Sequence, residues 1–264
     1  MSAIRLGAVD YLNARPLTYG LEQRSDLFAL RYDPPSRCAV LLHDGQIDVG
    51  MIPAIEYCRG PEYRIVPGMG IISRGTVASV ALFTKVPVSQ IRTIAADTSS
   101  RTSNALVRIL CHEQFGIAPE FSPMAPDPDA MLAAADAALI IGDPALFLDP
   151  AEKGVEKIDL GEQWTAMTGL PFVWAFWAGR PGVMSPEAVR ALEHARDAGV
   201  ADSDAIAAGY AGPSRAALGQ AYLRDNIQYE MGDGEIAGVR RYYELAARHG
   251  LIESPRELFF YPGN

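Results

Sequence analysis

Residues 76–86, TVASVALFTKV, and residues 171–178, PFVWAFWA, are long β-prone runs that no helix signal follows closely. They interrupt a chain in which short strands otherwise alternate with helices. The stretch between the two runs has strand and helix signals of its own. We therefore expect two lobes joined by these two extended crossovers, with a ligand cleft between the lobes.

Outside the two runs, strands and helices alternate at the spacing of a mainly parallel α/β sheet. In the first part the pattern predicts strands over 4–9, 27–32 and 47–52, and helices from Pro16 and over 36–43 and 53–58. In the inserted part it predicts strands over 92–96 and 137–141, and helices over 101–115, 129–135 and 164–168. After the second run only helices are expected, over 186–199, 203–210, 213–229 and 233–249.

The predicted division of the chain follows from these patterns. Residues 1–82 and 176–264 are expected to form lobe one, and residues 83–175 are expected to form lobe two. A chain of 264 residues is long enough to give each lobe a core of its own.

Composition and charge exclude several classes of protein. The net charge is −9, with no basic stripe of the kind that a nucleic-acid-binding surface needs. No apolar run reaches the ~18 residues of a membrane helix. The opening residues, MSAIRLGAVDYLNARPL, lack the basic and long apolar regions of a secretory signal, which favours the cytoplasm.

The metal-binding and redox residues form no recognisable framework. The three cysteines, Cys38, Cys58 and Cys111, are widely spaced and contain no C-x-x-C pair, and the four histidines show no H-x-x-x-H spacing. We expect neither a disulfide framework nor a metal site, and the cysteines are expected to be small buried hydrophobes.

The first polar motif is YLNARPL, residues 11–17, directly after the first predicted strand. Ligands of open α/β sheets bind at this edge. Asn13 offers both a donor and an acceptor, and Arg15 offers a guanidinium fork for a carboxylate. The alternative is structural, in which Asn13 satisfies the loop backbone and Arg15 is solvated at the start of a helix.

The second motif, DTSSRTS over residues 97–103, follows a strand and opens a helix. The motif has more hydroxyl groups, among them those of Ser100, Thr102 and Ser103, than capping of the helix requires. One serine satisfies one or two free backbone donors. A helix start with neighbouring hydroxyls also favours anions, and Arg101 could add positive charge. We favour a carboxylate or phosphate site over a heavily capped helix.

Three further positions are candidates for contact with a ligand. In IIGDPAL, residues 140–146, Gly142 permits close approach of the backbone, and Asp143 is either a helix cap or a hydrogen-bonding or acid–base group. Ser79 lies at the first crossover and could face the cleft or simply be tolerated in a strand. Thr168 precedes the second crossover, where the aromatic residues are expected to form core or cleft wall.

None of these motifs forms a Ser-His-Asp set, a phosphate-binding loop or a G-x-G-x-x-G turn, so hydrolase, NTPase and nicotinamide functions gain little support.

Six segments occur together in order, namely YLNARPL, GQIDVGMIPAIEY, SRGTVASVALF, DTSSRTSNAL, LIIGDPAL and WTAMTGLPFVWAFWA. Over residues 4–180 the chain thereby resembles the chorismate dehydratase family of the futalosine route to menaquinone.

That resemblance implies an α/β, two-lobed fold of the type II periplasmic-binding-protein kind with two crossover hinge strands. It also implies a lyase without metal or organic cofactor, which eliminates water from chorismate to give 3-[(1-carboxyvinyl)oxy]benzoate. The more distant resemblance is to the dihydroxynaphthoate synthase of the same route. Asn13 and Ser79 match polar cleft positions of the family, and Asp143 matches its GD motif.

Within this interpretation the helix start at 100–103, together with Arg15 or Arg101, would suit the two carboxylates of chorismate, with Gly142 and Thr168 beside them. No histidine falls in any motif, so the proton goes either to Asp143 or to the enolpyruvyl carboxylate of the substrate itself.

Two other classes of function stay open at this stage. A solute-binding protein for a small carboxylate would use the same lobes, and fold alone does not distinguish it from an enzyme. A ligand-sensing domain of a regulator is disfavoured, because no helix-turn-helix segment precedes residue 1. We expect a monomer or a homodimer, with a small molecule rather than nucleic acid or membrane as its partner.

Overall fold

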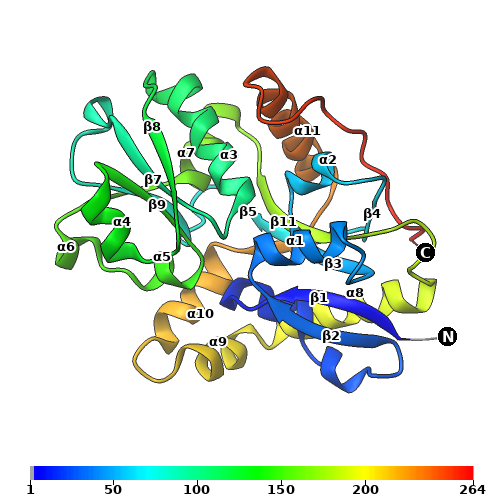
Figure 1. The fold of residues 1–264 in the computed structure, drawn as a ribbon. Coiled ribbons are helices and arrows are strands. Elements are labelled where there is room, and N and C mark those ends of the chain that lie inside the picture. Colours follow the sequence, from blue (N-terminus) through cyan, green and yellow to red (C-terminus); the bar gives the residue numbers. More distant parts are fainter. Residues whose placement is uncertain (1–2, 264) are drawn as a thin grey trace.

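The computed structural model describes residues 3–263, which form two sheets lying beside each other (Figure 1). The first sheet has the strand order β12-β5-β11-β3-β1-β2, with β4 paired to β11, and the second has the order β10-β6-β9-β7-β8. The strands of the first sheet are β1 (Ile4–Val9), β2 (Phe28–Asp33), β3 (Val49–Pro53), β4 (Arg64–Ile65), β5 (Met69–Ser73), β11 (Phe172–Gly179) and β12 (Gln228–Glu230). Those of the second are β6 (Val80–Thr84), β7 (Thr93–Asp97), β8 (Glu120–Met124), β9 (Ala137–Ile141) and β10 (Glu156–Asp159).

Both sheets have a parallel part, but antiparallel pairings outnumber parallel ones among the described strands, so the expectation of a mainly parallel sheet was wrong. Strand β1 pairs in parallel with β2 and β3, and β7 pairs in parallel with β8 and β9. The two β-prone runs supply the antiparallel strands: β6 pairs with β9 and β10, and β11 pairs with β3 and β5. The two-sheet α/β architecture is therefore confirmed.

The two runs differ from the expectation in where they begin and which sheet they join. The first strand starts at Val80 rather than at residue 76, and all of β6 lies in the second sheet, whereas all of β11 lies in the first. Boundaries at 82/83 and 175/176 would cut both strands. We propose the connections 74–79 and 169–171 as the lobe boundaries, because each strand is hydrogen-bonded whole within one sheet.

Helices pack around each sheet. Around the first lie the 3₁₀-helices η1 (Leu12–Thr18) and η2 (Leu21–Gln23) and helices α1 (Pro35–His43), α2 (Glu56–Arg59), α8 (Pro186–Ala201), α9 (Ser203–Ala211), α10 (Ala216–Asp225) and α11 (Asp233–Arg248). Around the second lie η3 (Val88–Gln90), α3 (Arg101–Leu110) with its π-helical extension η4 (Cys111–Phe115), α4 (Pro128–Ala134), α5 (Asp143–Phe147), α6 (Pro150–Lys153) and α7 (Leu160–Thr168).

Two helix predictions were wrong. The helix expected from Pro16 is a 3₁₀-helix that already begins at Leu12, with the proline inside it. The expected helix over 213–229 is two elements, because α10 ends at Asp225 and Gln228–Glu230 then form an edge strand on β5. Tyr229 of that strand is buried, and the free edge of β5 supplies backbone hydrogen-bond partners that a helix would forgo.

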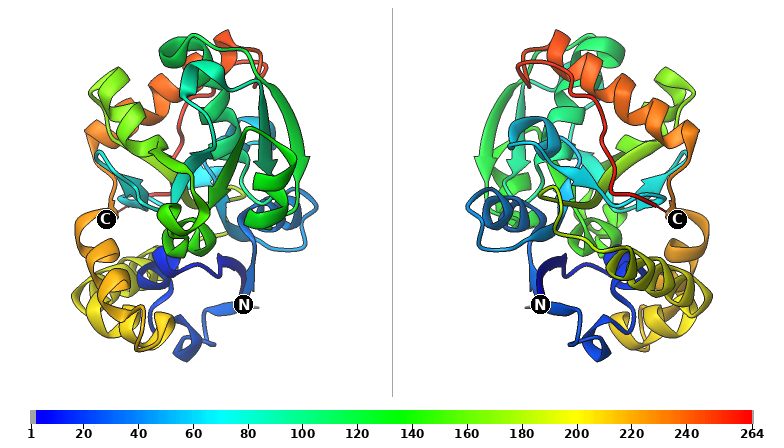
Figure 2. Two further views of the ribbon diagram at one scale, coloured as in Figure 1. Left: turned by 90° about the vertical axis from the view of Figure 1, so that its left-hand side faces the viewer. Right: turned by 90° about the vertical axis from the view of Figure 1, so that its right-hand side faces the viewer.

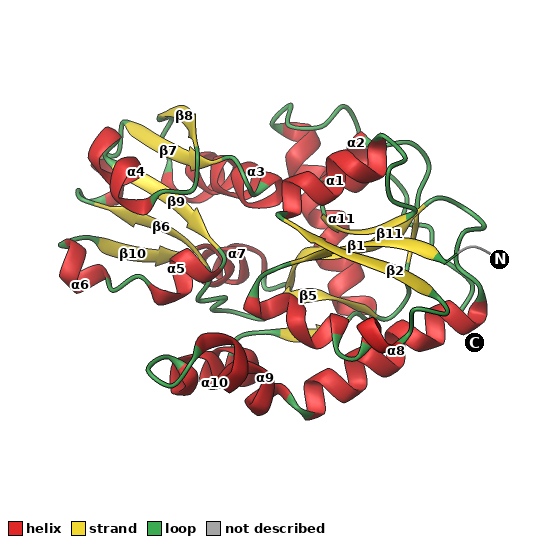
Figure 3. Ribbon diagram, turned by 60° about the horizontal axis from the view of Figure 1, so that its bottom comes forward, coloured by secondary structure: helices red, strands yellow, loops and turns green. Residues whose placement is uncertain are grey.

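The C-terminal helices position the first loop of the chain. Helices α8, α9 and α10 all contact η1. Figures 1 and 2 show α8–α10 (yellow to orange) on the opposite side of the molecule from α11 (orange to red). Figure 3 shows α9 and α10 along one edge between the two sheets. Within residues 3–263, no helix is long and apolar enough to cross a membrane.

Candidate functional site

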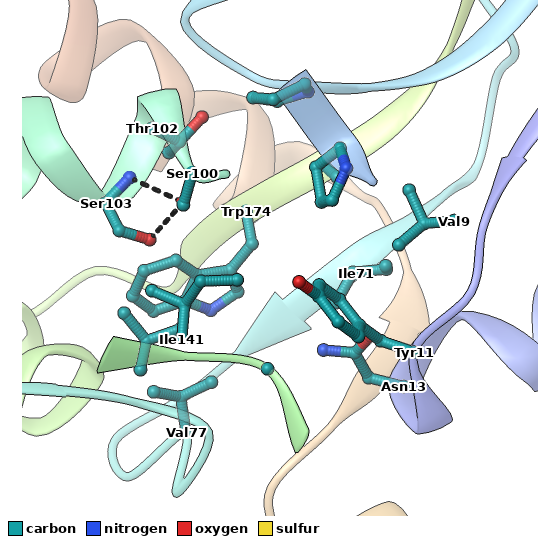
Figure 4. Close-up of a pocket in the computed structure, with 15 residues that line it drawn as sticks. Val9, Tyr11, Asn13, Ile71, Val77, Ser100, Thr102, Ser103, Ile141 and Trp174 are labelled. Carbon is teal, nitrogen blue, oxygen red and sulfur yellow. Dashed lines mark hydrogen bonds between the residues drawn. The ribbon is translucent and has the colours of Figure 1, made fainter. Parts of the chain in front are cut away.

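A pocket lies between the two sheets (Figure 4). Val9, Pro53 and Ile141 line it, and these are the last residues of β1, β3 and β9. The pocket therefore occupies the carboxyl edge of the strands, as expected for an α/β fold. Its full lining is Val9, Tyr11, Asn13, Pro35, Pro53, Ile71, Val77, Val80, Ser100, Thr102, Ser103, Ile141, Gly142, Trp174 and Ala175.

None of the fifteen described residues that line the pocket carries a charge. One wall is apolar and comes from both lobes, with Ile71 and Trp174 from the first sheet and Ile141 from the second. The indole of Trp174 is held in place because its Nε1 donates to Ser73 Oγ at 3.1 Å. A flat, planar ligand with a few polar groups fits such a pocket.

The first polar group comes from the loop after β1. Asn13 lines the pocket from η1, and its Oδ1 is buried without a hydrogen-bond partner among residues 3–263. Tyr11, two residues earlier, also lines the pocket, and Figure 4 shows its side chain beside that of Asn13. The Tyr11 ring lies close to Gly142 of the other lobe. An unpaired acceptor in a pocket wall is costly without a ligand that donates to it.

The second polar group is the start of α3, where Ser100, Thr102 and Ser103 line the pocket. Ser100 is the N-cap: its Oγ accepts from the backbone N of Ser103 at 3.3 Å and lies 2.8 Å from Ser103 Oγ (Figure 4). The helix is capped, and residues with hydroxyl groups also line the pocket, whereas the anion site itself stays a prediction. A helix start with neighbouring hydroxyl groups is suited to an anion.

Gly142 also lines the pocket, and its φ is +67°. A Cβ placed there would lie 2.9 Å from Cε2 and Cζ of the Tyr11 ring. The residue therefore has to be glycine both for its backbone conformation and for this close approach.

Ser79 lies just outside the lining, between Val77 and Val80, which belong to it. The serine is 1% exposed, and its Oγ accepts from Tyr222 Oη at 2.6 Å. It precedes β6 rather than lying within a strand, because Ala78 adopts a φ of +60° and turns the backbone.

The two arginines expected to hold carboxylates do not line the pocket. Arg15 pairs with Asp10 and stacks on the rings of Tyr32 and Tyr210. Arg101 pairs with Glu56, with 2.6 Å between Nη1 and Oε2. Asp10 stands five residues before Arg15, whereas Glu56, the partner of Arg101, is distant along the chain. A role of either arginine toward a substrate carboxylate stays a prediction.

Asp143 and Thr168 are also placed outside the interlobe pocket. One carboxylate oxygen of Asp143 accepts from the backbone N of Leu12 at 3.1 Å, and the other accepts from the hydroxyl of Tyr210. Burial raises the pKa of Asp143, although these two hydrogen bonds oppose the shift. The Thr168 hydroxyl donates to Trp164 O at 2.8 Å, which makes it part of the end of α7.

Three contributors to the site were not among the predicted site residues. Trp174 and Tyr11 could have been found, because both lie inside motifs that carry polar site residues, but their aromatic rings are equally typical of a core. Tyr222 had no signal, since it comes from the C-terminal helices, far along the chain from every motif.

The comparisons with known proteins agree with this architecture. The sequence matches the menaquinone biosynthesis family over residues 4–248. The chorismate dehydratase of Thermus thermophilus is 30% identical over 280 residues, covering 97% of this chain and 98% of that protein.

Two solved structures show the same fold. A protein from Archaeoglobus fulgidus superposes with a TM-score of 0.76 at 20% identity, covering 95% of this chain and 99% of that one. The periplasmic aliphatic sulphonate binding protein SsuA from Escherichia coli gives a TM-score of 0.66 at 17% identity, covering 100% of this chain and 95% of that one. The periplasmic-binding-protein-like fold is thus confirmed, and with the family match over most of its length this chain belongs to the menaquinone biosynthesis family.

Proposed function

We propose that the protein is a cofactor-independent lyase that removes water from chorismate and releases 3-[(1-carboxyvinyl)oxy]benzoate for menaquinone synthesis by the futalosine route, in the cytoplasm. The observation that carries the proposal is the interlobe pocket, which has hydroxyl groups at the start of α3, an unpaired Asn13 oxygen and an apolar aromatic wall. The full-length relationship to the Thermus thermophilus chorismate dehydratase supports this substrate.

The pocket suits a planar dianion without using an arginine. Ser100, Thr102 and Ser103 are all at least nine-tenths buried, so hydrogen bonds from their hydroxyls to a carboxylate are shielded from water. The N-terminus of α3 adds a favourable electrostatic field. Trp174 and Ile141 then contact the faces of the ring, which becomes aromatic in the product.

The reaction breaks a C–H bond and a C–O bond on neighbouring ring carbons, and the hydroxyl leaves as water. Asn13 Oδ1, which has no partner within residues 3–263, can accept from the ring hydroxyl and orient it. Ser79, close beneath the pocket wall, can donate to the oxygen as it departs. Aromatisation makes the elimination strongly downhill, so orientation and modest polar assistance suffice.

The proton acceptor is the substrate's own enolpyruvyl carboxylate in this proposal. No carboxylate lines the pocket among the described residues, and both oxygens of Asp143 already accept hydrogen bonds from Leu12 and Tyr210. Asp143 instead joins β9 of lobe two to η1 of lobe one.

Replacing Asp143 with asparagine tests whether the proton acceptor is Asp143 or the enolpyruvyl carboxylate of the substrate. Asp143→Asn keeps the acceptor for Leu12 and removes the basic carboxylate, so we expect kcat within about tenfold of wild type, because general-base removal costs about 10²–10⁴-fold. The measurement is steady-state turnover of chorismate. A loss of several thousand-fold in kcat with KM unchanged would make Asp143 the base.

The direct test of the function is incubation of the purified, chelator-treated protein with chorismate, followed by liquid chromatography with mass detection. The proposal expects loss of one water and formation of an aromatic enol ether without added cofactor. Intact chorismate that nevertheless raises the melting temperature would indicate a solute-binding protein, the function of the sulphonate-binding structural relative. Neither turnover nor stabilisation would mean that chorismate is not the substrate.

A further inference from the structure

Tyr222 is a buried polar residue next to the pocket to which neither the sequence motifs nor the reaction assigns a role. It lies on α10, is 1% exposed, and donates from its hydroxyl to Ser79 Oγ at 2.6 Å. Helix α10 also contacts η1, the element that carries Asn13. Tyr222 thus reaches the site from the C-terminal part of the chain.

Burial raises the pKa of Tyr222 far above that of a free phenol. The phenol therefore keeps its proton and acts as a donor at neutral pH. A serine hydroxyl can accept one hydrogen bond and donate another. Because Tyr222 fills the acceptor side of Ser79, the serine's own hydrogen is left for a different acceptor.

The backbone around Ser79 is fixed independently. The N of Ser79 donates to Val77 O at 2.7 Å across Ala78, in a tight turn whose φ is +60°. Asp159 accepts from the N of Val77 at 3.0 Å and from the N of Ala78 at 2.7 Å, and Lys157 Nζ donates to Ala78 O at 2.7 Å. These backbone contacts leave the Ser79 side chain and its hydroxyl free to rotate. The hydrogen bond from Tyr222 restricts that rotation.

We propose that Tyr222 is a positioning residue that orients the Ser79 hydroxyl, so that Ser79 donates its hydrogen bond to the hydroxyl group leaving the substrate. The inference rests on the proposed dehydration of chorismate and adds a residue to it. Tyr222 does not touch the substrate in this account and acts only through Ser79. The geometry that carries it is the 2.6 Å contact between two buried hydroxyl groups beside the pocket wall.

The test compares Tyr222→Phe with Tyr229→Phe. Tyr229 is also buried and lies four residues past the end of α10, but its hydroxyl has no hydrogen-bond partner among residues 3–263. Each substitution removes one buried hydroxyl from the same region. We expect Tyr222→Phe to lower kcat by about 10- to 100-fold with KM within about threefold of wild type, and Tyr229→Phe to leave both unchanged.

A double-mutant cycle with Ser79→Ala shows whether Tyr222 acts through the serine. In the Ser79→Ala background, Tyr222→Phe is expected to cause no further loss of kcat, since the group that it orients is gone. Site-specific 3-fluorotyrosine at 222, which keeps the ring and the donor, is expected to restore turnover. Melting curves of all variants separate a loss of folding from a loss of rate.

Three results would overturn the inference: a Tyr222→Phe enzyme with wild-type kcat, a loss equal in the Ser79→Ala and wild-type backgrounds, or an equal loss in Tyr229→Phe. Failure of the proposed function itself is distinct from these, because the wild-type protein would then not dehydrate chorismate at all.

Discussion

Gly142 shows how one residue joins the two lobes of the site. Its φ is +67° and it lies close to the Tyr11 ring. An added Cβ would therefore strain the backbone and also clash with that ring. We expect Gly142→Ala to destabilise the protein by about 2–3 kcal/mol, since left-handed strain alone costs about 1–2 kcal/mol. It should also lower chorismate turnover, because Tyr11 has to move into the pocket or away from it.

A control for this prediction is Gly169→Ala, which shares the positive φ of Gly142 but has a ψ of 5° rather than −150°. Gly169 has a φ of +70° at the end of α7, but a Cβ there would meet no atom within 4 Å. Urea unfolding should show a loss of about 1 kcal/mol for this variant, with activity retained. Equal unfolding free energies and equal turnover for the two variants would show that the Tyr11 contact is unimportant.

At the scale of elements, the connection between β5 and β6 depends on one carboxylate. Asp159 Oδ1 accepts from the backbone N of Val77, Gly161 and Glu162 at 3.0, 2.9 and 3.0 Å. Its Oδ2 accepts from Ala78 N at 2.7 Å. The residue thus caps α7 and holds the turn before Ser79 at the same time.

We expect Asp159→Asn to reduce the free energy of unfolding by about 1–3 kcal/mol, because an amide NH₂ would replace the oxygen that faces Ala78 N–H. The control is Asp127→Asn, where a single oxygen accepts from Asp129 N and Ala130 N, both at 3.1 Å. Asparagine caps helices as well as aspartate, so this control should change stability little. Urea denaturation checks both, and equal losses would refute the role assigned to Oδ2.

Some strands of the fold could be predicted from the sequence and others could not. Strand β1 and the buried run of β11 could be located because their residues are apolar over most of a strand's length. Edge strands such as β12 and β8 could not, since they are short or largely exposed and gain their partners only from the sheet beside them. Local patterns contain no information about such partners.

The residues of the candidate site could likewise be predicted only where local sequence patterns place them. Asn13 and Ser100 were predicted at the pocket because polar residues directly after a strand gather at one edge of the sheet. Arg15 and Arg101 lie outside the pocket lining because each pairs with an acidic residue. Asp10 is a neighbour of Arg15 in the sequence, but Glu56 is brought to Arg101 only by the fold. Tyr222 was not found because only the packed molecule brings α10 to Ser79.

At the scale of the whole molecule, Glu56 forms an ion pair between the lobes. It is 1% exposed and contacts Arg101 of α3 at 2.6 Å, His43 at 3.0 Å and Arg59 at 2.9 Å. Burial alone would raise the pKa of Glu56, but the hydrogen bond with His43 and the two arginine charges outweigh it and lower the pKa to about 2.

Because the folded pKa of Glu56 lies below its ordinary value of 4.5, the stabilisation is complete above that value and is lost as the pH falls toward about 2. We expect Glu56→Gln to lose about 3 kcal/mol of unfolding free energy at neutral pH. This difference from wild type should shrink as the pH is lowered through that window.

Glu62→Gln is the control, since the Glu62 side chain is 65% exposed and, within residues 3–263, has Arg64 as its ion-pair partner at the surface. Its effect should be under about 1 kcal/mol at every pH. Urea unfolding of wild type and both variants across the acid range makes the comparison, and a Glu56→Gln difference that grew toward low pH would contradict the assignment.

The most direct measurement of the central claim is chorismate turnover by wild type, Asn13→Ala and Thr168→Ala in one assay. Asn13 lines the interlobe pocket, whereas Thr168 only closes the end of α7. We predict dehydration by the wild type, a loss of about 100-fold or more in Asn13→Ala, and wild-type rates in Thr168→Ala. No dehydration by the wild type, or equal rates in wild type and Asn13→Ala, would contradict the account.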